Sequence, residues 1–184
     1  KPNYVSNSVG TKNVVYFDSN DVLYRDNFKN ESNNYINASI SNPYTVFIVF
    51  ESRNNASDKR LYEGGPSLKT HYYSTTTYSR WLEMESGVVI RSDYGLYGSN
   101  RLSVSSQIYN GTDSALFLNG IQVSSQKNAG TEAISYLYIG ANSHTGGHGH
   151  TGDIAEFMIF NTVVSANNRA SIEKYLADKW EISE

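Results

Sequence analysis

The chain has 184 residues, of which 18% are charged, a formal net charge of −3 and no cysteine. This length predicts one domain spanning residues 1–184, which we expect to be part of a larger protein. The lack of thiols excludes disulfides and thiolate metal sites. The basic residues are scattered, which argues against nucleic-acid binding, and no apolar run is long enough to insert into a membrane.

The first predicted strand covers residues 14–17 and is stopped by the polar run 18–21. A short strand follows at 34–36. The run 44–50 (YTVFIVF) is uninterrupted apolar or β-branched, which predicts a central strand with both faces covered.

Short strands continue along the chain at the intervals typical of an all-β domain. They are predicted at 80–84, 88–91, 102–109, 136–139 and 153–160. The loops are predicted at 51–59, 63–69 and 142–152. Ser86-Gly87 separates two of these strands and predicts a hairpin there.

The sharpest local signal is Asn119-Gly120, which divides the apolar runs 115–118 and 121–123. A two-residue type I′ turn needs positive φ at both central residues, and Asn-Gly provides this most readily. A hairpin is therefore predicted at 115–123.

One helix is predicted at the end of the chain, with Ser165 as its N-terminal cap. Ile172, Tyr175, Leu176 and Trp180 recur at helical spacing, so we expect this stripe to pack on the sandwich.

Several segments resemble laminin G-like, concanavalin A-type domains. NVVYFDSND (13–21) and NPYTVFIVF (42–50) resemble the opening of that family, and LFLNG (116–120) with YIG (138–140) resembles its hairpin and next strand. The segment 152–180 resembles its closing strand and helix. The resemblance implies a two-sheet antiparallel jelly-roll sandwich with one C-terminal helix. Its members are commonly sugar-binding or adhesive modules of enzymes, adhesins or phage tail proteins, and some bind calcium at the sheet rim.

An aromatic cluster between residues 72 and 97 predicts a site for a glycan or polysaccharide. Tyrosine faces would stack on sugar rings, while arginine and asparagine would hydrogen-bond sugar hydroxyls. The candidate ligand-binding residues are Tyr72, Tyr73, Arg80, Trp81, Tyr94, Tyr97 and Asn100. Trp81 could equally be a core residue, and the tyrosines could simply fill an edge strand.

We expect a non-catalytic lectin-like module for adhesion or receptor recognition, outside the cell or on a cell or virion surface. An alternative is a structural, protein-interaction or oligomerising spacer without a sugar site, trimeric if it comes from a fibre. A third hypothesis is a glycoside hydrolase using Glu83 and Glu85, which share a strand face. Ser86-Gly87 follows at once, so the strand ends before a third acid could join.

Two segments could hold metal ions. Asp18, Asn20 and Asp21 offer oxygen ligands of the kind calcium prefers, although such a run also forms an ordinary polar turn. His148 and His150 would point the same way on an extended segment and, with His144, could bind a transition metal. A flexible glycine-rich loop without metal is the alternative.

Overall fold

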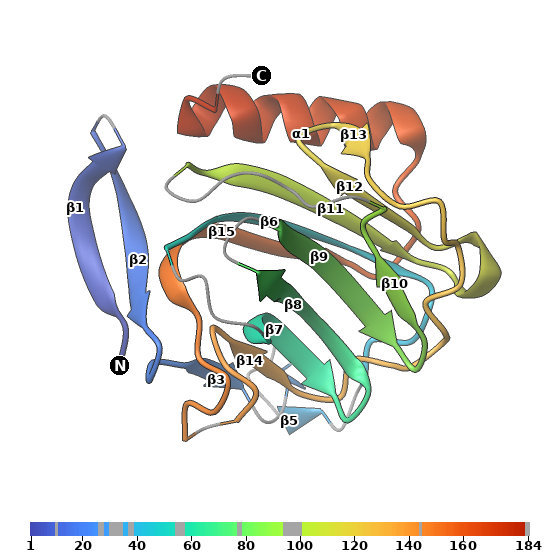
Figure 1. Ribbon diagram of the computed structural model, residues 1–184. Coiled ribbons are helices and arrows are strands. Elements are labelled where there is room, and N and C mark those ends of the chain that lie inside the picture. Colours follow the sequence, from blue (N-terminus) through green and yellow to red (C-terminus); the bar gives the residue numbers. More distant parts are fainter. Residues whose placement is uncertain are drawn as a thin grey trace.

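The computed structural model describes residues 1–9, 11–25, 28–29, 35–36, 39–53, 58–76, 79–93, 101–143 and 145–182. Two antiparallel sheets face each other, and one helix lies outside them (Figure 1). This is the two-sheet jelly-roll sandwich with a C-terminal helix that the strand pattern predicts.

Seven strands form sheet A and six form sheet B. Sheet A has the order β1 (Asn3–Val9), β2 (Lys12–Asp18), β15 (Thr151–Phe160), β6 (Tyr44–Ser52), β11 (Ser103–Tyr109), β12 (Ala115–Leu118) and β13 (Ile121–Gln122). Sheet B has the order β10 (Val89–Arg91), β9 (Ser79–Ser86), β8 (Leu68–Thr76), β7 (Lys59–Gly65), β14 (Leu137–Ile139) and β3 (Leu23–Arg25). A short pair, β4 (Phe28–Lys29) with β5 (Tyr35–Ile36), and a 3₁₀ turn at Gly111–Asp113 complete the described elements.

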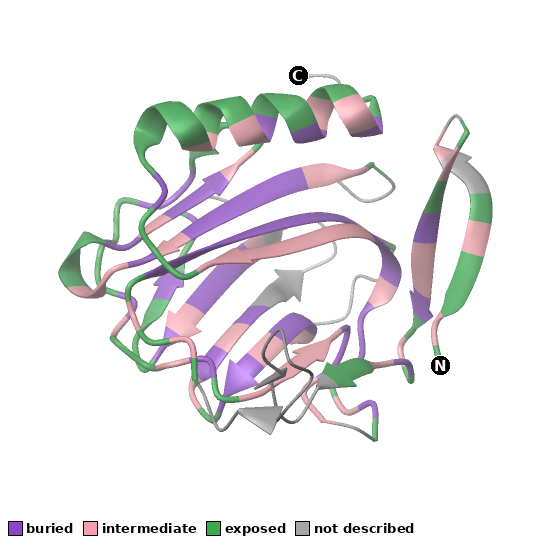
Figure 2. Ribbon diagram, turned by 180° about the vertical axis from the view of Figure 1, so that it is seen from behind, coloured by how far each residue is buried: buried purple, intermediate pink, exposed green. Residues whose placement is uncertain are grey.

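Strand β6 lies in the middle of sheet A and is covered on both faces, as predicted (Figure 2). Val46, Ile48 and Phe50 belong to the core between the two sheets. Phe47 and Val49 alternate with them and pack in a second cluster on the other face. This alternation is why an unbroken apolar run forms a strand here.

Helix α1 (Ala166–Trp180) covers the outer face of sheet A, and Ser165 caps it by accepting a hydrogen bond from the backbone N–H of Asn168. Leu176 and Trp180 are buried against the sheet, as predicted. The prediction is wrong for Tyr175, whose side chain is 59% exposed. Residues three or four apart share a helix face, and Glu173 takes the inward position one turn before Leu176 and two turns before Trp180. No helix in the described ranges is long and apolar enough to cross a membrane.

The Asn119-Gly120 hairpin is confirmed, with φ of 47° at Asn119 and 81° at Gly120. The predicted loop at 63–69 is confirmed only for the turn at 66–67, because residues 63–65 end β7 and residues 68–69 begin β8. A Cβ on Gly64 would lie 2.8 Å from Cδ2 of Leu68, so glycine is needed here for close packing within the sheet.

Candidate functional site

The outer face of sheet B carries a cluster of polar side chains. The side chains that point the other way, toward sheet A, define the inner face of sheet B. Among them, the hydroxyls of Tyr62 and Thr70 hydrogen-bond Oε1 of Gln107 in sheet A, at 2.5 and 2.9 Å. Successive strand residues point to opposite faces, so Glu63 and Lys69 point away from sheet A. Helix α1, the one α-helix among the described residues, packs on sheet A, so no described helix covers this face of sheet B.

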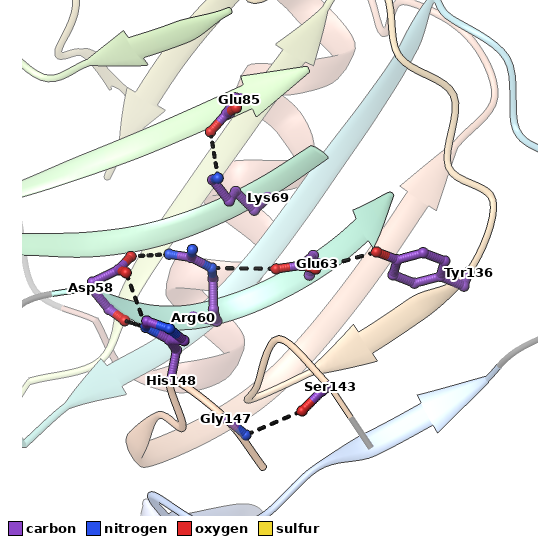
Figure 3. A network of polar contacts seen from close by, with 9 residues as sticks. All are labelled: Asp58, Arg60, Glu63, Lys69, Glu85, Tyr136, Ser143, Gly147 and His148. Atoms are coloured by element: carbon purple, nitrogen blue, oxygen red, sulfur yellow. Dashed lines mark hydrogen bonds and ion pairs between the residues drawn. The ribbon is translucent and has the colours of Figure 1, made fainter. Parts of the chain in front are cut away.

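Charges of alternating sign run across three neighbouring strands of this face. Lys69 on β8 is paired in register with Glu85 on β9 and with Glu63 on β7. Its Nζ lies 2.9 Å from Oε2 of Glu85 (Figure 3). Opposite charges on directly paired positions stabilise a sheet, and they also hold these side chains in place.

Arg60 joins this row to the loops at one end of sheet B. Its side chain is only 8% exposed and pairs with the carboxylates of Asp58 and Glu63, with 3.4 Å between Nε and Oε2 of Glu63. Asp58 also pairs with His148, whose Nδ1 lies 2.9 Å from Oδ2 (Figure 3). Burial raises the pKa of Glu63, and the nearby Arg60 partly opposes this.

The two carboxylates of the hydrolase hypothesis, Glu83 and Glu85, lie on the same face, and each pairs with a basic side chain. Glu83 is almost fully buried and pairs with Nε of Arg91 on the adjacent β10. Glu85 pairs with Lys69. Trp81, two residues before Glu83, is half-buried and belongs to neither core cluster.

Three tyrosines lie together at the β14–β3 edge of this face, and we call them the aromatic strip: Tyr136, Tyr138 and Tyr24. The ring centroids of Tyr136 and Tyr138 are 4.9 Å apart, and those of Tyr138 and Tyr24 are 6.2 Å apart. Tyr24 is 58% exposed. The hydroxyl of Tyr136 donates to Oε1 of Glu63 at 3.2 Å, and burial together with this carboxylate raises the pKa of Tyr136 to about 12.

Four of the predicted sugar-binding residues, Tyr72, Tyr73, Arg80 and Trp81, belong to strands of sheet B. The backbones of Tyr72 and Tyr73 belong to β8 and that of Arg80 to β9, while their side chains lie outside the described part. Tyr73 is the register partner of Trp81, and Tyr72 is that of the core residue Leu82. Tyr94, Tyr97 and Asn100 lie outside the described residues. Binding by this set stays a prediction.

The predicted calcium segment forms a tight turn after β2. Oδ2 of Asp21 accepts from the backbone N–H of Asp18, and Oδ1 of Asp18 accepts from that of Asn20, both at 3.2 Å. Asp18 and Asn20 are exposed, whereas Asp21 is buried. These bonds account for the turn, and calcium binding by it remains a prediction.

The structure separates the two described histidines of the glycine-rich loop, contrary to the expected parallel arrangement. His148 has a φ of 51°, so the segment is not extended, and its ring is at the surface beside Asp58. His150 is fully buried with Nε2 3.0 Å from the carbonyl oxygen of Glu51, and burial lowers its pKa to about 4. His144 lies outside the described residues, among which no group of three or more His, Cys, Asp or Glu could hold a metal ion.

The sequence reasoning missed the aromatic strip and the Arg60–Glu63 network. Tyr136 and Tyr138 stand two apart in a predicted strand, a spacing that puts them on one face and could have been noticed. No sequence signal connects them with Tyr24, because only the pairing of β14 with β3 brings it there.

Comparison with known proteins identifies related folds at low sequence identity. No family model and no curated protein matches the chain. A candidate carbohydrate-binding protein from Bacteroides ovatus superposes with a TM-score of 0.65 at 14% identity, over 84% of this chain and 45% of its own. Domain 4 of AbnA, an extracellular arabinanase from Geobacillus stearothermophilus solved with arabinotriose, superposes with a TM-score of 0.66 at 11% identity. The match covers 94% of this chain and 81% of that domain. The CBM40 of the Ruminococcus gnavus IT-sialidase, bound to α2,3 sialyllactose, superposes with a TM-score of 0.52 at 12% identity. The match covers 85% of this chain and 100% of that domain.

This chain spans less than half of the Bacteroides ovatus protein but most of the other two domains. At these identities the likeness shows the fold alone. The chain therefore has the jelly-roll fold found in carbohydrate-binding domains.

Proposed function

We propose that the chain is a non-catalytic carbohydrate-binding module of the laminin G-like, concanavalin A-type kind, carried by a larger secreted, cell-surface or virion protein. The main support is the aromatic strip beside fixed polar groups on the outer face of sheet B. Sugars have apolar ring faces and peripheral hydroxyls. A site with the exposed ring of Tyr24 and the half-buried rings of Tyr136 and Tyr138 next to the held carboxylate of Glu63 is complementary to both.

In this site Tyr24 and Tyr138 stack against sugar rings, and the carboxylate of Glu63 accepts hydrogen bonds from sugar hydroxyls. Arg60 and Tyr136 hold that carboxylate before any ligand arrives. A preformed site loses less side-chain entropy on binding. A few ring contacts give a single-site dissociation constant of about micromolar to millimolar, which several copies of the module would strengthen through avidity.

The residues predicted from the sequence extend this site toward β9. Trp81 stands on the same strand face as Glu83 and Glu85, and Tyr73 is its register partner. We propose that these residues, with Tyr72, Arg80, Tyr94, Tyr97 and Asn100, contribute further sugar contacts. Binding of calcium by the turn at 18–21 is a separate proposal.

Binding without catalysis is supported by the state of the two acidic candidates. A retaining hydrolase needs one carboxylate as nucleophile and a second as proton donor. Glu83 and Glu85 each form an ion pair with a base, Arg91 or Lys69. Glu83 is also almost fully buried, which keeps it from contacting a sugar ring.

The solved neighbours support a sugar ligand without naming one. Arabinotriose and α2,3 sialyllactose are chemically different sugars bound by domains of this fold. The experiment is therefore a broad glycan array, followed by calorimetry with and without calcium. Tyr24→Ala should weaken binding about tenfold, whereas Tyr175→Ala, on the opposite side of the sandwich, should not. If the wild-type protein binds no glycan under either condition, the proposal fails and the spacer or protein-interaction alternative is favoured.

A further inference from the structure

The aromatic strip continues into a hollow at the edge of the sandwich. Beyond Tyr24 the surface is hollowed beside strand β3 and the β1–β2 hairpin, over a volume of about 430 Å³ (Figure 1 shows the elements). The lining comes from Lys1 and from the mainly apolar side chains of Pro2, Tyr4, Val15, Val22, Leu23 and Tyr24. Since Tyr24 belongs to both features, the strip and the hollow adjoin at this residue, and we call the two together the path.

The apolar side chains of this path are unusually open to solvent. Tyr4 is 69% exposed, Tyr24 58% and Leu23 44%. Contiguous exposed apolar surface marks interaction sites more often than isolated exposed residues do. The hydroxyl of Tyr4 accepts a hydrogen bond from Nδ2 of Asn13, which fixes the ring without burying it.

The rings of the strip are not coplanar. The planes of Tyr136 and Tyr138 are inclined by 45°, and those of Tyr138 and Tyr24 by 49°. A flat crystalline polysaccharide would need coplanar rings. Rings that turn from one position to the next are complementary to a single chain whose sugar units also turn.

The described basic groups beside the strip and the hollow differ in their pairing. Arg60, Lys69 and Arg91 each lie in an ion pair with a carboxylate. Lys1, which lines the hollow, pairs with Asp21 through its terminal ammonium, while its side chain is fully exposed. An anionic sugar can therefore meet Lys1 without displacing one of these carboxylates.

From these observations we propose that the strip and the hollow together bind an internal stretch of a single, soluble polysaccharide chain, several sugar units long. The proposal rests on the carbohydrate-binding function and adds the binding mode.

The test is calorimetry with arabinan, xylan, mixed-linkage β-glucan and galactomannan. It continues with oligosaccharides of the best binder, from disaccharide to hexasaccharide. Affinity should rise about tenfold along this series. Tyr4→Ala should remove most of that rise and leave the disaccharide unchanged, because Tyr4 lies at the far end of the path. Tyr24→Ala should weaken binding of every length, and the exposed control Tyr175→Ala should change nothing.

The outcomes separate this proposal from the proposed function. Equal affinity for disaccharide and hexasaccharide, with Tyr4→Ala unchanged, overturns the extended site but leaves carbohydrate binding intact. Binding only to insoluble cellulose or chitin likewise overturns this mode alone. If the wild-type protein binds none of these polymers and no glycan on the array, both proposals are overturned.

Discussion

The hydroxyl of Tyr136 donates a hydrogen bond to Oε1 of Glu63 across 3.2 Å, while Nε of Arg60 lies 3.4 Å from the other carboxylate oxygen. Burial raises the pKa of Glu63, so the folded protein binds this proton more tightly than the unfolded chain. The resulting stabilisation is present below the ordinary pKa of glutamate and is lost as the pH rises through the native pKa.

Glu63→Gln should therefore be tolerated at neutral pH, because the amide oxygen still accepts from Tyr136, the partly buried carboxylate charge is removed, and Arg60 keeps its ion pair with Asp58. We expect a free energy of unfolding within about 1 kcal/mol of wild type at pH 7, or above it. As the pH falls through the native pKa of Glu63, the free energy of unfolding of the wild-type protein should rise relative to that of the variant. Chemical unfolding across this pH range measures the difference, and a loss of several kcal/mol at neutral pH would contradict this account.

Stability should also depend on pH through His150. Its pKa of about 4 lies below the ordinary value because the ring is fully buried. Between pH 6.5 and 4 the unfolded chain takes up a proton that the folded protein does not. As the pH falls over this range, the free energy of unfolding of the wild-type protein should decrease by on the order of 3 kcal/mol relative to that of His150→Gln, which lacks the titrating group. A difference between the two proteins that stays constant with pH would refute the assignment.

The contact of helix α1 with sheet A depends on a buried ion pair. Nη1 of Arg169 lies 2.6 and 2.7 Å from the two oxygens of Glu173, which also accepts from the hydroxyl of Ser106. Glu173→Ala leaves the guanidinium without its partner and should cost about 3 kcal/mol. The melting temperature should fall by roughly 6–12 °C. The double variant Arg169→Met, Glu173→Leu should recover most of this. A single variant as stable as wild type would show that the pair is dispensable.

The glycine-rich loop is specified by its packing on the turn after β2. A Cβ on Gly149 would lie 1.7 Å from the carbonyl oxygen of Ser19, which is backbone and cannot move aside. A Cβ on Gly147 would lie 2.4 Å from Oδ1 of Asn142, the end of a flexible side chain. Gly149→Ala should therefore cost at least about 2 kcal/mol and Gly147→Ala less than about 1 kcal/mol, as measured by thermal unfolding. Equal effects would show that this backbone contact does not determine the loop.

The predictions that held depend on short-range signals. Asn119-Gly120 has the positive φ values of a hairpin turn, and the alternation within 44–50 serves two cores. Both follow from local geometry, which a sequence records directly.

The failures arise where tertiary contacts decide. Gly64 resembles a loop residue but allows Leu68 to pack closely. His148 adopts a positive φ, which breaks the expected alternation with His150. Two of the three tyrosines of the aromatic strip could have been grouped from the sequence, since Tyr136 and Tyr138 stand two apart and so share a strand face. The approach of Tyr24 depends on a pairing more than a hundred residues away in sequence.

The most direct test of the central claim is to locate the ligand by NMR, titrating the isotope-labelled protein with soluble arabinan, xylan and β-glucan oligosaccharides in turn. We predict that amide shift changes concentrate on β14, β3 and β7, at Tyr24, Glu63, Tyr136 and Tyr138, and spare α1. Changes confined to α1 and its contact with sheet A would contradict the assignment of the site to the outer face of sheet B.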